Sequence, residues 1–341
     1  MIRIVGVVLV CTLTINRLKA QIDTYGAGSP LNNHLAEGEP KLPNFEPFMD
    51  LRLRDPYIIA GPDKTYYLTG TLPYNKGDST YNEGIPLWKS KDLKNWEDMG
   101  LIWTFDRDGT WQKQWTEKNG NMRRALWAPE IHYINQAWYV VYTVTGLGMG
   151  MMKSTSGLPE GPYVGVKNPD APMVNHSIDA TLFQDDDGKV YFLWGNGMIA
   201  LMNSDLTAFE GSPTRIIPLA IDSIAEHHYL PKHCKELDHV GFEAPFMFKK
   251  NGRYYFSCAD RYYGHYNNMT VESANILGPY TARYVSIPFC GHGSLFKDFN
   301  GHYWWTYFGN DKVSPFKKPA IIPVNFNDEG HLQPQFGNGL H

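Results

Sequence analysis

The sequence predicts an all-β fold, a five-bladed β-propeller that forms a single domain. Aromatic residues make up 14% of the 341 residues, and aromatic side chains pack well on pleated sheets. No long amphipathic helical pattern is evident in the sequence. Instead, a unit made of a short apolar run, a turn and an aromatic-rich strand recurs five times. Five similar sheets around one axis account for this recurrence.

Each recurring unit is predicted to be a β-hairpin at the inner edge of one blade. The apolar runs are residues 57–60, 131–134, 181–183, 245–248 and 294–296. The aromatic-rich strands are residues 65–68, 137–142, 189–194, 253–256 and 302–307. Asp-Gly or Asn-Gly pairs join the two strands in the last three units, and such pairs are strong signals for a hairpin turn. A β-sandwich is the alternative fold, but it would not account for five matched hairpins.

The chain begins with a pattern that is typical of a secretory signal peptide, predicted for residues 1–20. Arg3 precedes an apolar run over residues 4–15, which is too short to span a bilayer comfortably, and cleavage is expected after Ala20. Residues 21–50 are predicted to be an N-terminal extension, and residues 51–341 the propeller. We therefore expect a secreted or periplasmic protein without a membrane span in the mature chain.

Charge and cysteine content exclude several classes of protein. The formal net charge is −4, which gives no attraction to nucleic acid, so no nucleic-acid partner is expected. Cys234, Cys258 and Cys290 remain after the signal and form no C-x-x-C pair. A cysteine-rich zinc site is therefore excluded, and a disulfide framework is not expected. No phosphate-binding glycine loop is apparent, so no nucleotide cofactor is implied.

Three acidic residues lie just before three of the five hairpins. Asp55 precedes the first hairpin, Asp179 the third and Glu243 the fourth. The innermost strand of each blade lines the axial channel of a propeller, so residues at the strand starts converge even when they are far apart in sequence. The sequence therefore predicts that these three carboxyl groups meet in one cavity.

Taken in order, the motifs at these positions resemble those of glycoside hydrolase family 43. The resemblance extends from about Leu51 to Pro334. The motifs that carry it are Arg54-Asp55-Pro56, SKDLKNW at residues 90–96, Trp127-Ala128-Pro129-Glu130, Ile178-Asp179-Ala180, DDDGK at residues 185–189, Glu243-Ala244-Pro245 and Gly291-His292-Gly293-Ser294. Each motif is weak alone, but together, in this order and spread over the five blades, they are fairly specific.

The resemblance implies an inverting glycosidase with three acids in distinct roles. By position, Asp55 matches the general base, Asp179 the residue that orients and tunes the acid, and Glu243 the general acid. Inversion needs one ionised carboxylate to deprotonate a water and one protonated carboxyl to protonate the leaving oxygen, ~6.5–9.5 Å apart. A second acid nearby helps the general acid to keep its proton near neutral pH.

The resemblance also implies two substrate-binding residues. Trp127 is expected to form a wall of the sugar pocket, because aromatic faces stack on the C–H faces of sugars. His292 is expected on the propeller axis near the floor of that pocket. A calcium ion on the axis is a further expectation, held by His292 directly or through water, although calcium prefers oxygen ligands. No other cofactor is expected, and Glu130 is expected to be structural.

The expected activity is hydrolysis of O-glycosyl bonds by general acid–base catalysis. It would release arabinofuranosyl, xylosyl or galactosyl units from a polysaccharide or oligosaccharide, the only partner that the sequence implies. One alternative is a carbohydrate-binding propeller without catalysis, and the presence of all three acids argues against it. The other is a related propeller hydrolase acting on anhydro-sugar or fructosyl linkages. Exo or endo action and the oligomeric state stay open.

One departure from the common pattern of this family and one long insertion bear on the shape of the pocket and its rim. Ala244 follows Glu243 where many members have glycine, and its methyl group is expected to narrow the pocket or shift the local backbone. Residues 101–124 form a long insertion that contains Trp103, Trp111 and Trp115. Such a loop on the rim of the channel is expected to shape substrate choice.

Overall fold

The structure is a computed structural model that describes residues 46–73, 82–116, 124–219, 239–262, 265–308 and 318–335. The expected signal peptide, most of the N-terminal extension and Cys234 lie outside these residues. The domain boundaries therefore stay predictions. Cys258 and Cys290 are buried free thiols. Among the described residues, no helix combines the length and the hydrophobicity needed to cross a bilayer.

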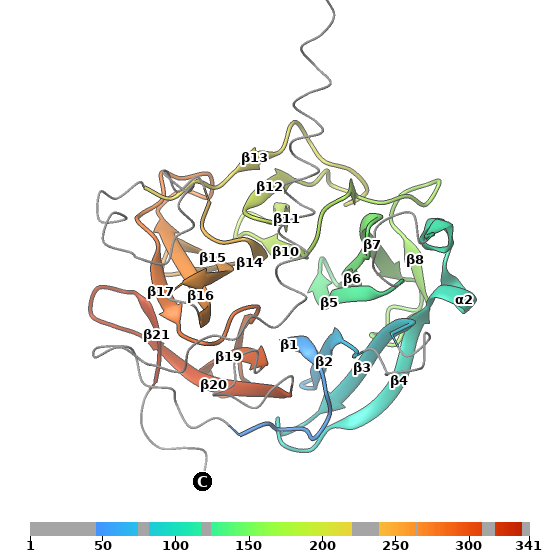
Figure 1. Ribbon diagram of the computed structural model, residues 1–341, viewed down its shortest axis with the longest axis horizontal. Helices are drawn as coiled ribbons and strands as arrows, with labels where there is room; N and C mark the ends of the chain where they lie inside the picture. The colour runs from blue at the N-terminus through green and yellow to red at the C-terminus, as the bar shows by residue number, and fades with distance from the viewer. Residues whose placement is uncertain are drawn as a thin grey trace, which may run out of the picture. The chain divides into compact units, whose positions relative to one another are not determined.

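Five antiparallel sheets, each the blade of a propeller, contain all the described strands (Figure 1). Blade 1 consists of β1 (Arg54–Ala60), β2 (Tyr66–Thr71), β3 (Gly84–Ser90) and β4 (Glu97–Thr104). Blade 2 consists of β5 (Leu126–Ile134), β6 (Ala137–Val144), β7 (Gly148–Ser154) and β8 (Tyr163–Gly165), with β9 (Val174–Asn175) also paired to β7. Blade 3 consists of β10 (Ala180–Gln184), β11 (Val190–Trp194), β12 (Met198–Leu201) and β13 (Thr214–Arg215).

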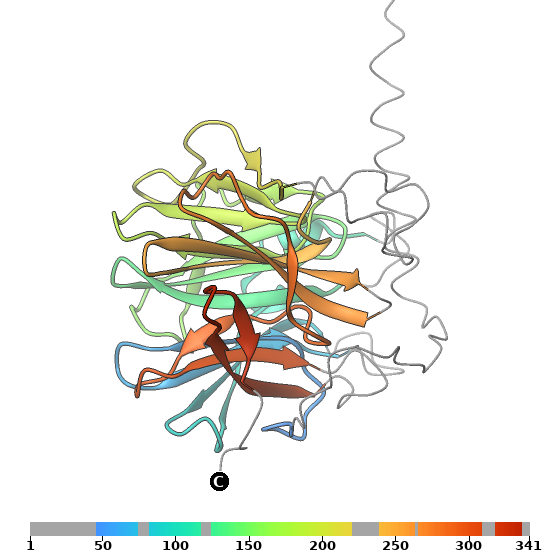
Figure 2. The same cartoon turned by 90° about the vertical axis from the view of Figure 1, so that its left-hand side faces the viewer.

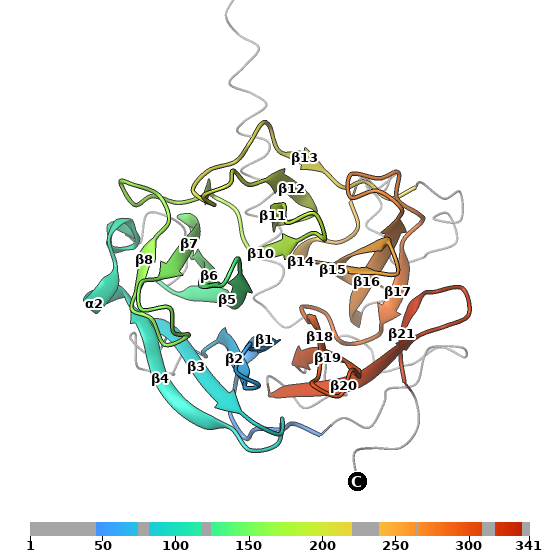
Figure 3. The ribbon, with the colours of Figure 1, turned by 180° about the vertical axis from the view of Figure 1, so that it is seen from behind.

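The C-terminal half of the chain supplies the last two blades. Blade 4 consists of β14 (Glu243–Lys250), β15 (Arg253–Tyr262), β16 (His265–Ser273) and β17 (Tyr284–Ile287). Blade 5 consists of β18 (Leu295–Lys297), β19 (Tyr303–Phe308), β20 (Pro319–Phe326) and β21 (Leu332–Pro334). The first strand of every blade faces the centre of the ring, as the views from both ends show (Figure 3). The prediction of five hairpins that form the inner edges of five blades is therefore confirmed.

The blades pack through apolar faces that come from the alternation of side chains along each strand. A cluster that joins blades 1, 2, 4 and 5 includes Ile85, Val140, Phe246 and Trp305, all buried. The strands of all blades run across the thickness of the ring in the side view (Figure 2). The hairpin turns and the strand starts that carry the acids therefore lie at opposite ends of the inner strands.

The insertion expected on the channel rim contributes two tryptophans to the core. Its first residues complete β4, and short helices follow, α2 (Phe105–Asp108) and the 3₁₀ helix η1 (Trp111–Gln114). Trp103 and Trp111 are 1% and 7% exposed and pack in the cluster that joins blades 1, 2, 4 and 5. These two tryptophans stabilise the fold, so the expectation of a rim loop was wrong for them. Residues 117–123 of the insertion lie outside the described residues.

Candidate active site

A left-handed backbone residue stands at the start of the inner strand of each blade. The five residues and their φ angles are Asp55 (52°), Ala128 (42°), Asp179 (55°), Ala244 (55°) and His292 (57°). In blades 1, 2 and 4 a proline follows, at a β-bulge where the ladder needs no backbone N–H. This shared turn directs the same position of each blade toward the ring centre, and three of the five positions carry ionisable groups.

Side chains from one blade hold the strand start of the next. The hydroxyl of Thr71 in blade 1 accepts a bond from the N–H of Ala128 in blade 2, at 2.7 Å. The hydroxyl of Thr143 in blade 2 accepts one from the N–H of Asp179 in blade 3, at 2.9 Å. The carboxylate of Asp179 in turn accepts from the N–H of Ala244 in blade 4, at 3.0 Å. This relay couples the positions of the acids across three blade interfaces.

Asp55 is a buried carboxylate with two polar neighbours. Its side chain is only 6% exposed. Oδ2 accepts a hydrogen bond of 2.6 Å from the hydroxyl of Thr71, and Oδ1 lies 3.2 Å from Nδ1 of His292. A carboxylate fixed by two hydrogen-bonding neighbours has a defined orientation, which a residue that deprotonates one particular water requires.

Asp179 lies close to the same histidine, and its environment favours the neutral carboxyl. Its Oδ2 is 3.8 Å from Nδ1 of His292. Burial, together with the negative charges of Glu243 and Asp55, raises the pKa of Asp179 to about 7, against the opposing influence of His292 and of the Ala244 N–H. A large share of Asp179 therefore carries a proton near neutral pH.

His292 is surrounded by carboxylates. Burial alone would lower its pKa, but the negative charges of Asp55, Asp179, Glu243 and Glu130 together raise the pKa above the ordinary histidine value. Its Nδ1 faces Asp55 and Asp179, as the distances above show. The imidazolium form that this arrangement favours is suited to hold the carboxylates in place.

The side chains around His292 combine carboxylate oxygens, which calcium prefers, with an imidazole whose charged form repels a cation. Calcium takes six to eight oxygen ligands, and a protonated imidazole is not a metal ligand. Among the described residues, no group of three or more His, Cys, Asp or Glu side chains is arranged to hold a metal. The calcium ion stays a prediction, and no catalytic step is derived from it.

Glu243 reaches the site from the fourth blade and is half-buried. Its Oε1 accepts a hydrogen bond of 2.6 Å from the hydroxyl of Tyr266, on the third strand of the same blade. The next residue, Ala244, is the one bonded to Asp179. Glu243 is therefore linked to Asp179 through the peptide unit of Ala244, and the pairing of an acid with a tuning carboxyl stays a prediction.

Two other residues from the sequence motifs lie on β5. Trp127 is half-buried and precedes Ala128 as Glu243 precedes Ala244, so it takes the corresponding position in blade 2. Glu130 lies further along β5, with its carboxylate 3.0 Å from Nε2 of His132. It lines a small axial cavity together with Asp55 and His292, so its charge acts on the site.

The sequence did not point to Thr71, Thr143 or Tyr266. These residues stand inside or at the end of second and third strands, where no motif marks them. A threonine toward the end of the second strand recurs in blade 5 as Thr306, whose hydroxyl accepts from the N–H of Ser294 at 2.9 Å. Alignment of the five repeats on one another could therefore have found the threonines, whereas Tyr266 left no such signal.

The chain is similar in sequence to proteins named as glycosidases. It is 28% identical over 265 residues to the β-D-galactofuranosidase xynD of Aspergillus niger, which covers 66% of this chain and 71% of that protein. It is 26% identical over 276 residues to the extracellular endo-α-(1→5)-L-arabinanase 1 of Bacillus subtilis, which covers 77% of each chain.

The fold is shared with solved structures. The α-L-arabinofuranosidase from Clostridium thermocellum superposes with a TM-score of 0.61 at 22% identity, over 82% of this chain and 92% of that one. The sequence profile of glycosyl hydrolases family 43 matches residues 45–332, a span that contains all five blades and the three acids. The chain therefore belongs to glycosyl hydrolases family 43 and is an enzyme that hydrolyses glycosidic bonds.

Proposed function

We propose that this enzyme hydrolyses arabinofuranosyl, xylosyl or galactosyl linkages of a polysaccharide or oligosaccharide with inversion at the anomeric carbon. The observation that supports this proposal most strongly is the meeting of Asp55, Asp179 and His292 within hydrogen-bonding or ionic reach, with Glu243 joined to the group through Ala244. Two relatives are named for furanosidic sugars, a galactofuranosidase and an arabinanase, so furanosides are the first substrates to test.

In the proposed mechanism, Asp55 is the base and Glu243 is the acid. Asp55 takes a proton from a water that attacks the anomeric carbon, as the C–O bond to the leaving group breaks. Glu243 gives its proton to the leaving oxygen, so the products are a free sugar and a free hydroxyl group. Asp179 orients the Glu243 segment through the Ala244 N–H, and the imidazolium of His292 stabilises the charge of Asp55. Trp127 is proposed to stack on the sugar.

The experiment that tests this mechanism uses aryl arabinofuranosides, xylosides and galactosides, with the anomer of the first-formed product followed by NMR. Glu243→Gln is expected to lower kcat about 10²–10⁴-fold on a substrate with a poor leaving group, and much less on an activated aryl glycoside. Asp55→Asn is expected to abolish turnover of both. Glu210→Gln, an exposed change in blade 3, serves as the control and should retain activity.

Two results would contradict the proposed roles. A product that retains the anomeric configuration would exclude direct attack by water. Equal losses on both kinds of leaving group in Glu243→Gln would exclude Glu243 as the acid, because protonation matters most when the leaving group is poor.

We also propose that the protein is exported. This proposal rests on the signal-like pattern of residues 1–20 and on the extracellular arabinanase among the relatives. Expression of the full chain in a bacterial host, followed by N-terminal sequencing of the periplasmic fraction, tests it. Recovery of an uncleaved chain in the cytoplasm would contradict export.

A further inference from the structure

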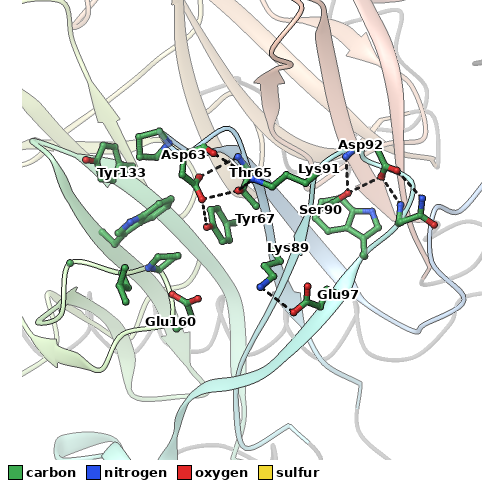
Figure 4. Close-up of a pocket in the computed structure, with 17 residues that line it drawn as sticks. Asp63, Thr65, Tyr67, Lys89, Ser90, Lys91, Asp92, Glu97, Tyr133 and Glu160 are labelled. Carbon is green, nitrogen blue, oxygen red and sulfur yellow. Dashed lines mark hydrogen bonds and ion pairs between the residues drawn. The ribbon is translucent and has the colours of Figure 1, made fainter.

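A groove with a volume of about 830 Å³ lies between blades 1 and 2, away from the carboxylates. The turn after β1, the end of β3 with the start of β4, and the loop after β7 form it (Figure 4). Asp55 starts β1 and the turn at Asp63 follows its end, so the length of this strand, roughly 20 Å, separates the two places. The volume is within the range of small-ligand sites, about 300–1,000 Å³.

Aromatic side chains form the apolar part of the groove. Trp96 and Tyr133 are half-buried, so each keeps part of its ring surface open. The ring of Trp96 packs 5.3 Å from that of Phe48, and the ring of Tyr133 packs 4.9 Å from that of Trp138. Rings held by such neighbours lose little freedom when a ligand stacks on them. Leu158 on the rim is 57% exposed and adds apolar surface.

The lysines in the groove are already paired. Lys89 makes an ion pair of 3.0 Å with Glu97. Lys91 donates to the hydroxyl of Thr65 at 2.6 Å and to the carbonyl of Lys64 at 3.2 Å. Among the described residues, the groove is lined by four carboxylates, those of Asp63, Asp92, Glu97 and Glu160, and by only these two lysines, which disfavours phosphates and acidic peptides.

Two acidic side chains in the groove are also committed to their own turns. The carboxylate of Asp63 accepts from the hydroxyls of Thr65 and Tyr67, and that of Asp92 from the N–H groups of Lys94 and Asn95. They present fixed acceptors rather than free charges.

Glu160 is an acidic side chain of the groove that, unlike Asp63 and Asp92, is not bonded within its own turn. It is exposed, faces the groove from the side of Tyr133, and has no hydrogen bond or ion pair within the described part of the chain (Figure 4). A carboxylate with two open oxygens can accept bonds from a pair of neighbouring hydroxyl groups. Stacking rings with fixed acceptors and a carboxylate are the groups that recognise an uncharged sugar chain.

We propose that this groove is a second carbohydrate-binding site, which holds a neutral oligosaccharide stretch of the polymer outside the catalytic centre. The proposal rests on the proposed function, because it takes the polymer substrate as its ligand. Two sites on one enzyme raise the effective concentration of the second contact once the first is made, so polymer binding should exceed binding of a single aryl glycoside.

The test compares variants of the full-length chain on polymer and on a small substrate. Dissociation constants for linear arabinan, xylan and galactan are measured by affinity electrophoresis, with Glu243→Gln present in every protein to prevent hydrolysis. Trp96→Ala and Leu158→Arg are the groove variants, and Tyr191→Ala, a half-buried tyrosine in blade 3, is the matched control. Leu158 is exposed, so its replacement by a long cation blocks the groove without opening the core.

We expect both groove variants to bind the preferred polymer about tenfold more weakly than the parent, which carries Glu243→Gln alone. The control should bind the polymer as tightly as the parent does. With Glu243 restored, kcat/KM on the aryl glycoside should stay within twofold in every variant. Unchanged polymer binding in Leu158→Arg, or no binding of any of the three polymers by the parent, would overturn the groove proposal while leaving aryl glycoside hydrolysis intact. Absence of aryl glycoside hydrolysis by the wild-type protein would instead refute the proposed function. The groove proposal would also be overturned if a basic protein, rather than a sugar polymer, bound in the groove.

Discussion

The left-handed backbone conformation at position 244 is unfavourable for alanine. A residue with a Cβ at φ near +55° loses roughly 1–2 kcal/mol relative to glycine, because Cβ crowds the following carbonyl. The methyl group of Ala244 recovers part of this loss by packing in a small cluster with Ala259, Tyr266 and Phe308. The left-handed angle of Ala244 is similar to those at the equivalent positions of the other four blades, and the expected narrowing of the pocket or shift of the backbone relative to glycine stays a prediction.

Ala244→Gly is therefore expected to be much less destabilising than an alanine-to-glycine change at an ordinary strand position. Ala259 on β15 is the matched control, because it belongs to the same cluster and is fully buried. The free energy of unfolding in urea should fall by about 1–2 kcal/mol more for Ala259→Gly than for Ala244→Gly. Equal losses in the two variants would show that the left-handed angle carries no penalty here.

The raised pKa of Asp179 predicts a stability that falls as pH rises. The unfolded carboxyl has a pKa near 3.8 and the folded one about 7, so the folded state binds more protons between these values. The free energy of unfolding then decreases with pH over that interval. His292 acts in the same direction above its ordinary pKa, because its folded pKa is also raised.

Asp179→Asn removes one of these groups and is expected to flatten the decline of stability between about pH 4 and pH 7. Urea denaturation at a series of pH values measures the slope. Asp185→Asn is the control, because the contribution of Asp185 to stability changes with pH in the opposite direction. The bonds from Lys249 and Tyr254 outweigh the burial of Asp185 and lower the pKa of its carboxyl, so its stabilisation is present above the ordinary pKa and lost as pH falls. A steeper decline of the unfolding free energy with pH in Asp179→Asn would contradict the raised pKa of Asp179.

At the scale of the elements, a buried ion pair positions the segment that leads into β14. Arg283 forms an ion pair with Asp260, and both side chains are less than 5% exposed. The same guanidinium nitrogen donates to the carbonyl of Val240 at 2.9 Å, three residues before Glu243. The position of Glu243, the proposed acid, therefore depends on a contact made by β15 and the residue just before β17.

Arg283→Met is expected to lower the free energy of unfolding by about 3–5 kcal/mol, because it leaves the Asp260 carboxylate buried without its partner. The double variant Arg283→Met/Asp260→Leu should recover part of this loss, since neither charge then remains. Urea denaturation measures stability, and kcat on an aryl glycoside reports whether Glu243 keeps its position. A double variant no more stable than the single one would show that the bond to Val240, rather than the charge, is what matters.

At the scale of the whole molecule, the ring closes between blade 5 and blade 1 through side chains and through a backbone bond of 3.2 Å from the N–H of Phe48 to the carbonyl of Pro319 on β20. Each described blade takes its four principal strands from one continuous stretch of chain, and among the described strands none from the N-terminal end pairs with the last blade. Tyr66 on β2 is 4% exposed, its hydroxyl accepts from the N–H of Phe299 at 3.1 Å, and its ring packs 4.5 Å from the ring of Phe299.

Tyr66→Phe keeps the ring contact and removes the hydrogen bond, so it is expected to cost about 1 kcal/mol of unfolding free energy. Tyr66→Ala also removes the ring and is expected to cost about 3–5 kcal/mol. Tyr139→Phe is the control, because the hydroxyl of Tyr139 makes no hydrogen bond to the described residues although its ring is buried. Thermal unfolding followed by circular dichroism compares the three. Equal effects of Tyr66→Phe and Tyr139→Phe would rule out this closing bond.

The sequence alone determined the number of blades, the inner hairpins and the order of the acids, because turn pairs and alternating apolar residues are local signals. It could not show that Trp103 and Trp111 are core residues, or that Tyr266 contacts Glu243, because those neighbours come from other strands and other blades. Only the tertiary structure decided that Asp179 and His292 have raised pKa values. Such shifts depend on the burial and mutual distance of carboxylates from separate blades, and a sequence does not contain distances across a ring.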